Sequence, residues 1–417
     1  MKARWTSVQI PAREIPTLAR GLGSAGAPGL MFTRPSAAVY PDALVDVPLP
    51  DLPVNLSPLR RAAVLLEAAA EIEHVLCVQY LYAYYSLVPP TAAPPDLEPA
   101  VRKWGAHFRD IAFEEMGHLL SVQNLRAFVG LEPHFGRNAF PSANQYYPFP
   151  AELTPLSRRT LVRYVLAEAP WGAMVTEFES EAGLAVRRVG ILYGLLAVVF
   201  GDPAAAPGAT PDTADSWSTF VHEVSLAAFR AAPPARWTLD GSAFQARSII
   251  RQGKPDHFGG VGHVIIGTAQ SRHDAVTTIR DIGVQGEAPV EDEDAPSHYR
   301  RFRWIADGHD GVGPFNDAVA AAVVRPLPTN PKRSAYEGPA AAAAKRFDEA
   351  YAGLLRGLRR YLSSENDAVK GRLAHEALEH MYSMKTAARA LTELPPRPEA
   401  GGLAGPVFTL PRGFRTA

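Results

Sequence analysis

Two carboxylates and one histidine lie close together in the stretch FEEMGHLL, residues 113–120. The apolar residues around them predict a buried helix, on which Glu115 and His118 lie one turn apart on the same face. An ionised carboxylate inside a helical bundle costs several kcal/mol in desolvation unless a partner compensates it. A divalent metal ion compensates several such groups at once, and carboxylates and imidazoles are ligands that iron accepts. The spacing therefore indicates a metal site inside a bundle.

A further carboxylate comes from the helix that is predicted before this one. Ser57 and Pro58 are typical of a helix start. The residues that follow recur at spacings of four and three, as on the buried seam of a bundle helix: Leu66, Ala70, Glu73, Cys77, Tyr80 and Tyr84. Four-helix di-iron proteins take a Glu from each of two helices and an E-x-x-H pair from each of the other two. Glu73 supplies one of the single Glu ligands, and Glu115 with His118 supplies one of the E-x-x-H pairs.

The remaining ligands must come from downstream, where Glu287 and His298 are the best candidates. Glu287 ends a predicted helix, and His298 begins its resumption after the stretch APVEDEDAP. The acidic run at 291–294 is interpreted as a solvated loop. A helix split in this way can bring both side chains back to one centre, since irregular backbone often adjoins functional sites.

Helical patterns extend over most of the chain and predict an all-α fold. The expected helices cover 98–129, 155–168, 173–200, 214–231, 339–363 and 365–391, in addition to the one that starts at 58. Residues 1–57 are expected to form an irregular N-terminal arm and 393–417 an irregular tail. The helical domain would then span 58–392, with insertions at 131–153 and 201–270.

Composition excludes several classes of partner. The 417 residues carry a net charge of -1 without blocks of Lys or Arg, so neither nucleic acid nor an anionic membrane surface is expected as a partner. A single cysteine, Cys77, excludes an internal disulfide framework, and the absence of a signal-like N-terminus predicts a cytoplasmic location. The longest apolar run, 191–200, is too short to cross a bilayer and is expected in a buried helix.

Several stretches together resemble a known family. They are EIEHVLCVQYLYAYYSL, FRDIAFEEMGHLLSVQNLRAFVGLEP, TTIRDIGVQGEAPVEDEDAPSHYRRF and the closing FDEAYAGLLRGL and GLAGPVF. They resemble the ferritin-like domain of the iminophenyl-pyruvate dimer synthase family, named for enzymes of the violacein and indolocarbazole pathways. The resemblance runs from about residue 59 to 410. It implies a ferritin-like four-helix bundle with long loop insertions and extra C-terminal helices.

The resemblance also implies a ligand set for the metal. The residues that match are Glu73, Glu115, His118, Glu287 and His298. Where family members tend to show an acid or amide on the third helix, this chain reads VGILY, with Ile191 at that place. Glu177 and Glu181 lie two to four turns earlier, too far to replace it on a helix that rises ~1.5 Å per residue. The set is one carboxylate short, which leaves one or two metal ions open, as well as a centre of two His and one carboxylate.

The resemblance implies a non-haem iron-dependent oxidase or oxygenase of specialised metabolism, acting on a small substrate derived from an amino acid. The cofactor would be one or two iron ions, and manganese fits the same ligands. The partners would be the small-molecule substrate and O2, and a homodimer stays open. One alternative is a non-catalytic, metal-stabilised helical scaffold that binds a biosynthetic partner. Metal storage is another, although the long insertions suit a substrate cavity better than a shell subunit.

Other chemistry-bearing residues have simpler interpretations. The stretch AHEALEHMYSM holds pairs one turn apart that are typical of surface ion pairs: His375, Glu376, Glu379 and His380. Tyr80, Tyr84 and Tyr85 are interpreted as core residues, with a ligand contact or a radical role as the alternative. Cys77 is expected to be a small buried hydrophobe rather than a reactive thiolate.

Overall fold

The computed structural model describes residues 55–147, 149–170, 175–182, 189–259, 265–287, 296–309 and 311–414. These residues form helices and no β-strand, which confirms the predicted all-α class. The α-helices are α2 (Pro58–Ser86), α3 (Glu98–Phe128), α4 (Arg158–Ala167), α5 (Thr176–Ala182), α6 (Gly190–Phe200), α7 (Ser216–Ala231), α8 (Arg272–Glu287), α9 (His298–Asp307), α10 (Asp317–Val323), α11 (Gly338–Ser363) and α12 (Asp367–Leu391). The 3-10 helices are η1 (Pro90–Ala92), η2 (Pro203–Ala205), η3 (Pro234–Arg236), η4 (Gly241–Ala243), η5 (Ala246–Arg251), η6 (Pro255–Phe258) and η7 (Arg333–Ala335).

Capping residues set where the site-bearing helices begin. The hydroxyl of Ser57 accepts a hydrogen bond from the backbone N–H of Arg60 at 3.4 Å, and Pro58 occupies the first turn of α2. The hydroxyl of Ser297 caps α9 in the same way, by accepting from the N–H of Arg300 at 3.3 Å. His298 is therefore the first residue of α9, held at a fixed helix start.

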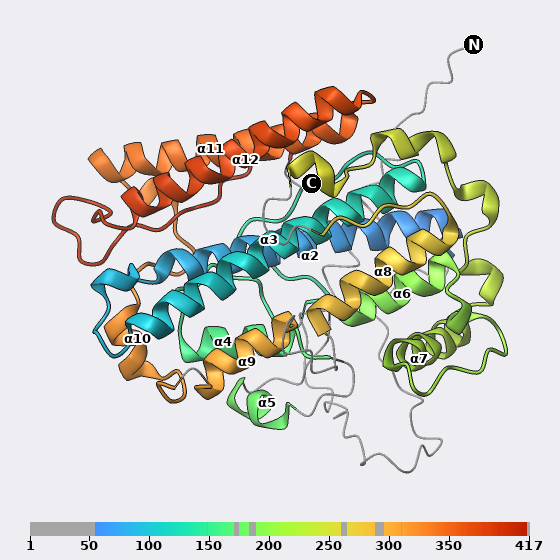
Figure 1. The fold of residues 1–417 in the computed structure, drawn as a ribbon, viewed down its shortest axis with the longest axis horizontal. Coiled ribbons are helices and arrows are strands. Elements are labelled where there is room, and N and C mark those ends of the chain that lie inside the picture. Colours follow the sequence, from blue (N-terminus) through green and yellow to red (C-terminus); the bar gives the residue numbers. More distant parts are fainter. Residues whose placement is uncertain are drawn as a thin grey trace.

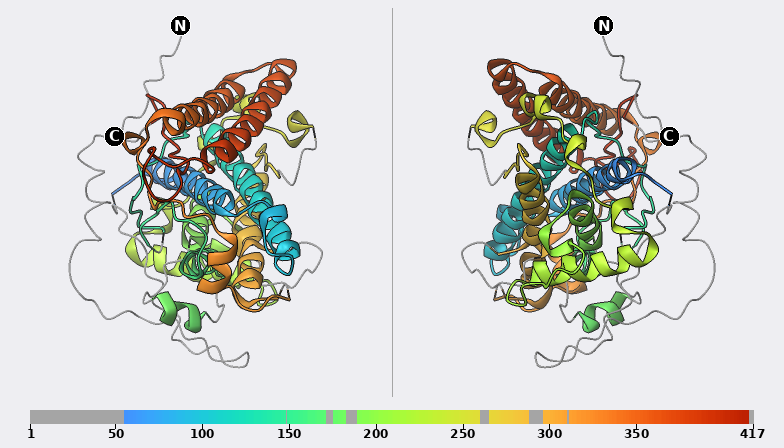
Figure 2. Two further views of the ribbon diagram at one scale, coloured as in Figure 1. Left: turned by 90° about the vertical axis from the view of Figure 1, so that its left-hand side faces the viewer. Right: turned by 90° about the vertical axis from the view of Figure 1, so that its right-hand side faces the viewer.

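The helices pack in layers around α2 and α3, which lie side by side in the middle (Figure 1). On one side of this pair, α4 lies beside α9 and α6 lies beside α8. On the other side lies the hairpin of α11 and α12, as Figure 2 also shows. Two sides of the bundle are therefore built from interrupted helices, α4 with α6 and α8 with α9. The predicted interruption between Glu287 and His298 agrees with the ends of α8 and α9.

The expectation of one continuous helix over 173–200 is wrong. Among the described residues, this region holds two helices, the short α5 and the separate α6. Their side chains differ in kind, because Glu177, Ser180 and Glu181 of α5 are exposed whereas every residue of α6 is buried. The polar part stays at the surface and the apolar part enters the core, which one straight helix could not do. Residues 1–54 of the predicted arm lie outside the described residues.

The C-terminal hairpin docks on α2 through both polar and aromatic contacts. Nε2 of His74 lies 2.6 Å from the hydroxyl of Tyr351 on α11. The ring of Phe347 on α11 meets the ring of Tyr85 on α2 edge-on, with 6.2 Å between the centroids.

None of the helices that the structure describes combines the length and the apolar character that a membrane span requires.

The segment that precedes α8, from residue 265 onward, lies directly against α3 beside His118. The N–H of Gly267 donates to the hydroxyl of Ser121 at 2.8 Å, and the side-chain amide of Asn124 donates to the carbonyl of Gly267 at 2.7 Å. The backbone of Ile265 passes so close to Gly117 that a Cβ atom there would lie 2.4 Å from the Ile265 carbonyl oxygen. The missing side chain at Gly117 therefore allows this close approach.

We expect Gly117→Ala to lower the free energy of unfolding by ~1–3 kcal/mol, because the overlap with Ile265 outweighs the gain in helix propensity. Gly105→Ala in the same helix is the matched control. A Cβ atom there would lie 3.5 Å from Cε2 of Tyr84, an ordinary contact, so this variant should gain up to ~1 kcal/mol. Urea unfolding of both variants tests the contrast. Equal stabilisation by the two changes would contradict the close approach at Gly117.

Candidate metal centre

Four of the predicted site residues lie together in the core of the bundle. They come from α2, α3 and α9, and they are Glu73, Glu115, His118 and His298. Their exposed fractions are 2%, 1%, 4% and 0%, respectively. Ionisable side chains buried to this degree require compensation from one another or from a bound ion.

Glu115 and His118 converge on Glu73 from the neighbouring helix. Nδ1 of His118 lies 3.2 Å from Oε2 of Glu115 and 3.4 Å from Oε2 of Glu73. The i, i+3 spacing on α3 places the first two side chains on one face, and α2 presents Glu73 to that face. These three side chains therefore form one compact group.

His298 approaches Glu115 from the opposite side. Its Nδ1 atom lies 2.9 Å from Oε1 of Glu115 and 3.7 Å from Oε2 of Glu168. Glu168 directly follows α4 as its C-cap residue and is 5% exposed. Glu168 was not among the predicted site residues. Each oxygen of Glu115 thus faces a different histidine, so this one carboxylate would serve as a ligand on both sides if metal ions were bound.

The side chains divide into two possible ligand groups that share one member. Glu73, Glu115 and His118 form the first, and Glu115, Glu168 and His298 form the second. Within each group, the nitrogen and oxygen atoms lie within 4.8 Å of one another. One group from α2 and α3 and one from α3, α4 and α9 therefore meet at Glu115.

Outer acceptors orient both imidazole rings. Nε2 of His118 lies 2.9 Å from Oε1 of Gln285 on α8, and Nε2 of His298 lies 2.8 Å from Oε2 of Glu114 on α3. Arg301, one turn after His298, also donates to Glu114. Because these acceptors take the Nε2–H of each ring, Nδ1 of each histidine is directed into the centre.

Two buried tyrosines hold the outermost carboxylates. The hydroxyl of Tyr193 on α6 donates to Oε1 of Glu73, and the hydroxyl of Tyr80 on α2 donates to Oε1 of Glu168. Each tyrosine bonds one oxygen of its carboxylate. The second oxygen of each carboxylate is directed towards a histidine.

Three polar atoms at the centre are buried without a hydrogen-bond partner among the described residues. They are Oε2 of Glu73, Oε1 of Glu115 and Nδ1 of His298. Oε1 of Glu115 and Nδ1 of His298 lie 2.9 Å apart, but they do not have hydrogen-bond geometry. This is expected of two metal-ligating atoms that are directed towards the same ion rather than towards each other. Buried polar atoms without partners are rare in folded proteins. The oxygen and nitrogen donors here fit iron or manganese.

Charges at the centre shift the pKa values strongly. Burial raises the pKa of Glu73 to about 8, and the charge of Glu115 adds to this effect. Burial alone would lower the pKa of His118, but Glu115 and Glu73 raise it to about 10. Burial raises the pKa of Glu115, but His298 and His118 outweigh it and hold that pKa well below its usual range. Without a metal ion, protons on Glu73 and His118 therefore balance the charge near pH 7.

Comparison with known proteins places this geometry in a family. A family model described as ferritin-like matches residues 66–307, which is more than half of the chain and includes every residue of both ligand groups. The chain belongs to the ferritin-like family. A solved structure described as a ferritin-like protein from Caulobacter vibrioides is 18% identical and aligns over 80% of this chain and 98% of its own, with a TM-score of 0.46. No curated protein sequence matches the chain.

The described centre holds three carboxylates and two imidazoles, the number that was expected, but Glu168 is a carboxylate that the expected set lacked and Glu287 lies outside the described side chains. Ile191 is buried on α6 and brings no ligand, but Glu168 at the end of α4 supplies a carboxylate on the same side of the bundle. The third side of the bundle is shared between α4 and α6, so the carboxylate lies before the interruption rather than after it. Glu177 and Glu181 pair with Arg303 and Arg158 instead and take no part in the centre.

The remaining candidates either lie outside the described residues or lie away from the centre. Glu287 is the last residue of α8, but its side chain lies outside the described residues, as does the acidic run at 291–294. His375 and Glu379 form an exposed pair 3.7 Å apart on α12. The thiol of Cys77 donates to the carbonyl of Ala112 at 3.4 Å, and burial raises its pKa, which agrees with an unreactive cysteine.

The cavity at the centre is small. Its volume is about 20 Å³, and its apolar walls come from Leu76, Val189, Ile282 and Gly283. A cavity needs ~10–15 Å³ of such space to hold one water molecule. The centre therefore has room for an ion or a water-sized group, and not for an organic molecule.

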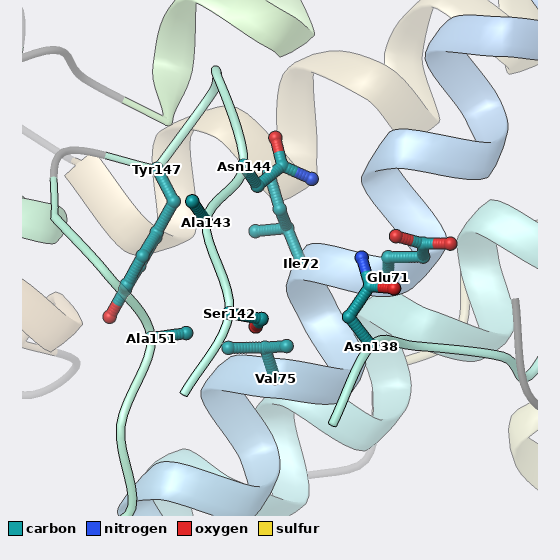
Figure 3. Close-up of a pocket in the computed structure, with 9 residues that line it drawn as sticks. All are labelled: Glu71, Ile72, Val75, Asn138, Ser142, Ala143, Asn144, Tyr147 and Ala151. Carbon is teal, nitrogen blue, oxygen red and sulfur yellow. The ribbon is translucent and has the colours of Figure 1, made fainter. Parts of the chain in front are cut away.

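A second cavity, also about 20 Å³, lies between α2 and the connection that follows α3 (Figure 3). Glu71 contributes to its wall and also forms a third possible ligand group with Glu67 and His134. Burial lowers the pKa of Arg126 to about 10, while the nearby carboxylates of Glu67, Glu132 and Glu71 act to raise it and so favour the charged guanidinium. Since Arg126 already supplies a positive charge there, this group does not require an ion.

Carboxylate-to-amide variants test the two ligand groups. Glu115→Gln should lose both metal ions, whereas Glu73→Gln and Glu168→Gln should each lose one, because only Glu115 belongs to both groups. The measurement is the number of manganese or iron ions per chain, by mass spectrometry after loading and desalting. Glu376→Gln on the exposed face of α12 is the control and should keep the wild-type content. Unchanged metal content in Glu115→Gln would contradict the assignment.

Metal binding should release protons. At pH 7, Glu73 and His118 each carry a proton, since their pKa values of about 8 and 10 lie above that pH. A divalent ion needs the carboxylate and the neutral imidazole, so we expect roughly two protons to leave with the first ion and the affinity to rise between pH 6 and 8. Calorimetry of Mn²⁺ binding in buffers of different ionisation enthalpy measures this release. A binding heat independent of the buffer would contradict it.

Proposed function

We propose that this ferritin-like protein is a non-haem iron-dependent oxidase or oxygenase that acts on a small substrate derived from an amino acid, in the biosynthesis of a specialised metabolite. Two arguments support the proposal. The first is the resemblance of its helical segments to the iminophenyl-pyruvate dimer synthase family. The second is the chemistry of the buried centre. The proposed partners are the substrate and O2.

The observation that carries the proposal is the placement of Glu115 between two ligand groups. One ion would be held by Glu73, Glu115 and His118, and a second by Glu115, Glu168 and His298. Three protein ligands for each ion leave coordination positions open. Iron bound in this way would supply the electrons that reduce O2, and manganese is the alternative cofactor.

The chain itself would position the ligands and exclude water. Gln285 and Glu114 fix the two imidazole rings, and Tyr193 and Tyr80 each fix one carboxylate. Preorganised ligands of this kind need no rearrangement when an ion binds. The apolar walls of the cavity keep bulk water away from the centre.

Access of an organic substrate requires the cavity to widen. Sites for small molecules usually enclose ~300–1,000 Å³, whereas this cavity is about 20 Å³. Val189 and Gly283 line the cavity without belonging to either ligand group, so widening of the cavity on their side would leave every ligand in place. The small volume also favours a second candidate function, a metal-stabilised scaffold that binds a biosynthetic partner and catalyses nothing.

Oxygen consumption separates these two functions. Protein loaded with Fe²⁺ without air and then mixed with O2 should consume O2 faster than the same amount of free Fe²⁺, and Glu115→Ala should remove this excess while its helical circular dichroism persists. The measurement uses an oxygen electrode and reports O2 consumed per chain. Tight iron binding that raises the melting temperature, without excess O2 consumption, would favour the scaffold and count against the oxidase.

A further inference from the structure

An arginine at the start of α2 is completely buried without an acidic partner. Arg61 lies in the first turn of the helix and is 0% exposed. Its guanidinium carbon lies 3.9 Å from the ring centroid of Trp237, which is itself 1% exposed. None of the described Asp or Glu side chains forms an ion pair or hydrogen bond with it. The ring of Trp237 covers one face of the guanidinium. This contact provides no hydrogen-bond acceptor for the nitrogen atoms along the edge of the guanidinium.

The atoms without partners define one particular edge of this guanidinium. Nε and Nη2 of Arg61 are buried and have no acceptor among the described residues. These two nitrogens form the side of the fork that binds a carboxylate through two parallel hydrogen bonds. The hydroxyl of Tyr146 is also buried without a partner, and it lies close enough for the two groups to influence each other electrostatically. The Nε and Nη2 groups of Arg61 and the hydroxyl of Tyr146 are therefore hydrogen-bond donors that have no acceptor among the described residues.

A buried cation without a counter-ion is strongly unfavourable. Burial lowers the pKa of Arg61, but a guanidinium keeps its proton at every physiological pH. The group therefore stays charged and requires an anion. A single carboxylate matches it, because one negative charge balances one positive charge and the planar group fits the fork. A doubly charged phosphate would leave an excess negative charge in the same buried space.

We propose that the Nε–Nη2 edge of Arg61 is a carboxylate-binding site, with the Tyr146 hydroxyl as an additional donor. The site is separate from the metal centre. Arg61 precedes Glu73 by twelve residues on α2, or roughly 18 Å at ~1.5 Å per residue. The proposal therefore stands independently of the function proposed above.

The carboxylate has two conceivable sources that share this chemistry. One is the chain itself, because Asp42, Asp46 and Asp51 occur in the sequence shortly before α2. The short connection would give such a side chain a high effective concentration at Arg61. The other source is the carboxylate of a small organic acid from solution. Each source predicts its own response to mutation and to added acid.

Replacement of Arg61 by an apolar residue gives results of opposite sign for a paired and an unpaired arginine. If a carboxylate of the chain is bound, Arg61→Met leaves it buried alone and lowers the melting temperature of the full-length protein by several degrees. If the carboxylate comes from a free acid, Arg61→Met abolishes its binding and the stabilisation that the added acid gives. If the arginine is unpaired, the same change removes a buried charge and raises the melting temperature. Arg60→Met is the matched control, since it removes an equal charge from an exposed neighbour in the same turn. Arg61→Lys keeps the charge without the two-pronged edge and should also melt earlier than wild type.

Aspartate variants and added organic acids distinguish the two sources of the carboxylate. If the acid belongs to the chain, changing Asp42, Asp46 and Asp51 to Asn lowers the melting temperature in wild type and much less in Arg61→Met. If it is a free acid, acetate or succinate raises the melting temperature of wild type relative to chloride of equal ionic strength, and Arg61→Met loses that response. Either coupling supports the site. The proposal is overturned if neither coupling is found, whichever way Arg61→Met shifts the melting temperature.

Discussion

Compensation of charge around Glu115 is the constraint on which the rest of the structure depends. Its two carboxylate oxygens face different histidines, at 3.2 Å and 2.9 Å, in a core that water does not reach. Neither the carboxylates nor the imidazoles could remain there alone. Each helix that reaches the centre contributes either a ligand or a group that holds a ligand. The bundle is thus arranged around polar atoms rather than around its apolar seam alone.

The interrupted helices follow from the same constraint. A continuous helix offers ligands only at intervals of one turn along one face, whereas the second ligand group takes Glu168 from just after α4 and His298 from the first turn of α9. Helix ends place side chains at angles that a helix interior does not provide. The breaks on two sides of the bundle therefore bring a carboxylate and an imidazole from two different helices together beside Glu115.

Much of the fold could be predicted from periodicity and capping. Ser57 with Pro58 marked the start of α2, and the break between α8 and α9 was expected from the loss of apolar pattern after Glu287. Glu73, Glu115 and His118 stood out because they lie on buried seams. Glu168 was equally visible as a lone acid after the apolar stretch LVRYVLA, but the family resemblance placed the expected ligand of the third helix at Ile191. Partners such as Gln285 depend on tertiary packing, which no local pattern reveals.

The hairpin of α11 and α12 has a consequence for how the protein can be divided. His74 adjoins the ligand Glu73 in sequence and faces the other way, where it meets Tyr351 of α11. Nη2 of Arg137 donates to that same hydroxyl at 3.3 Å and to the carbonyl of Phe408 at 2.6 Å, so the chain's last described segment joins the contact. A shortened protein that ends before α11 would leave His74 and Arg137 facing solvent. Although the family match ends at residue 307, the contacts that cover α2 extend to the C-terminal segment.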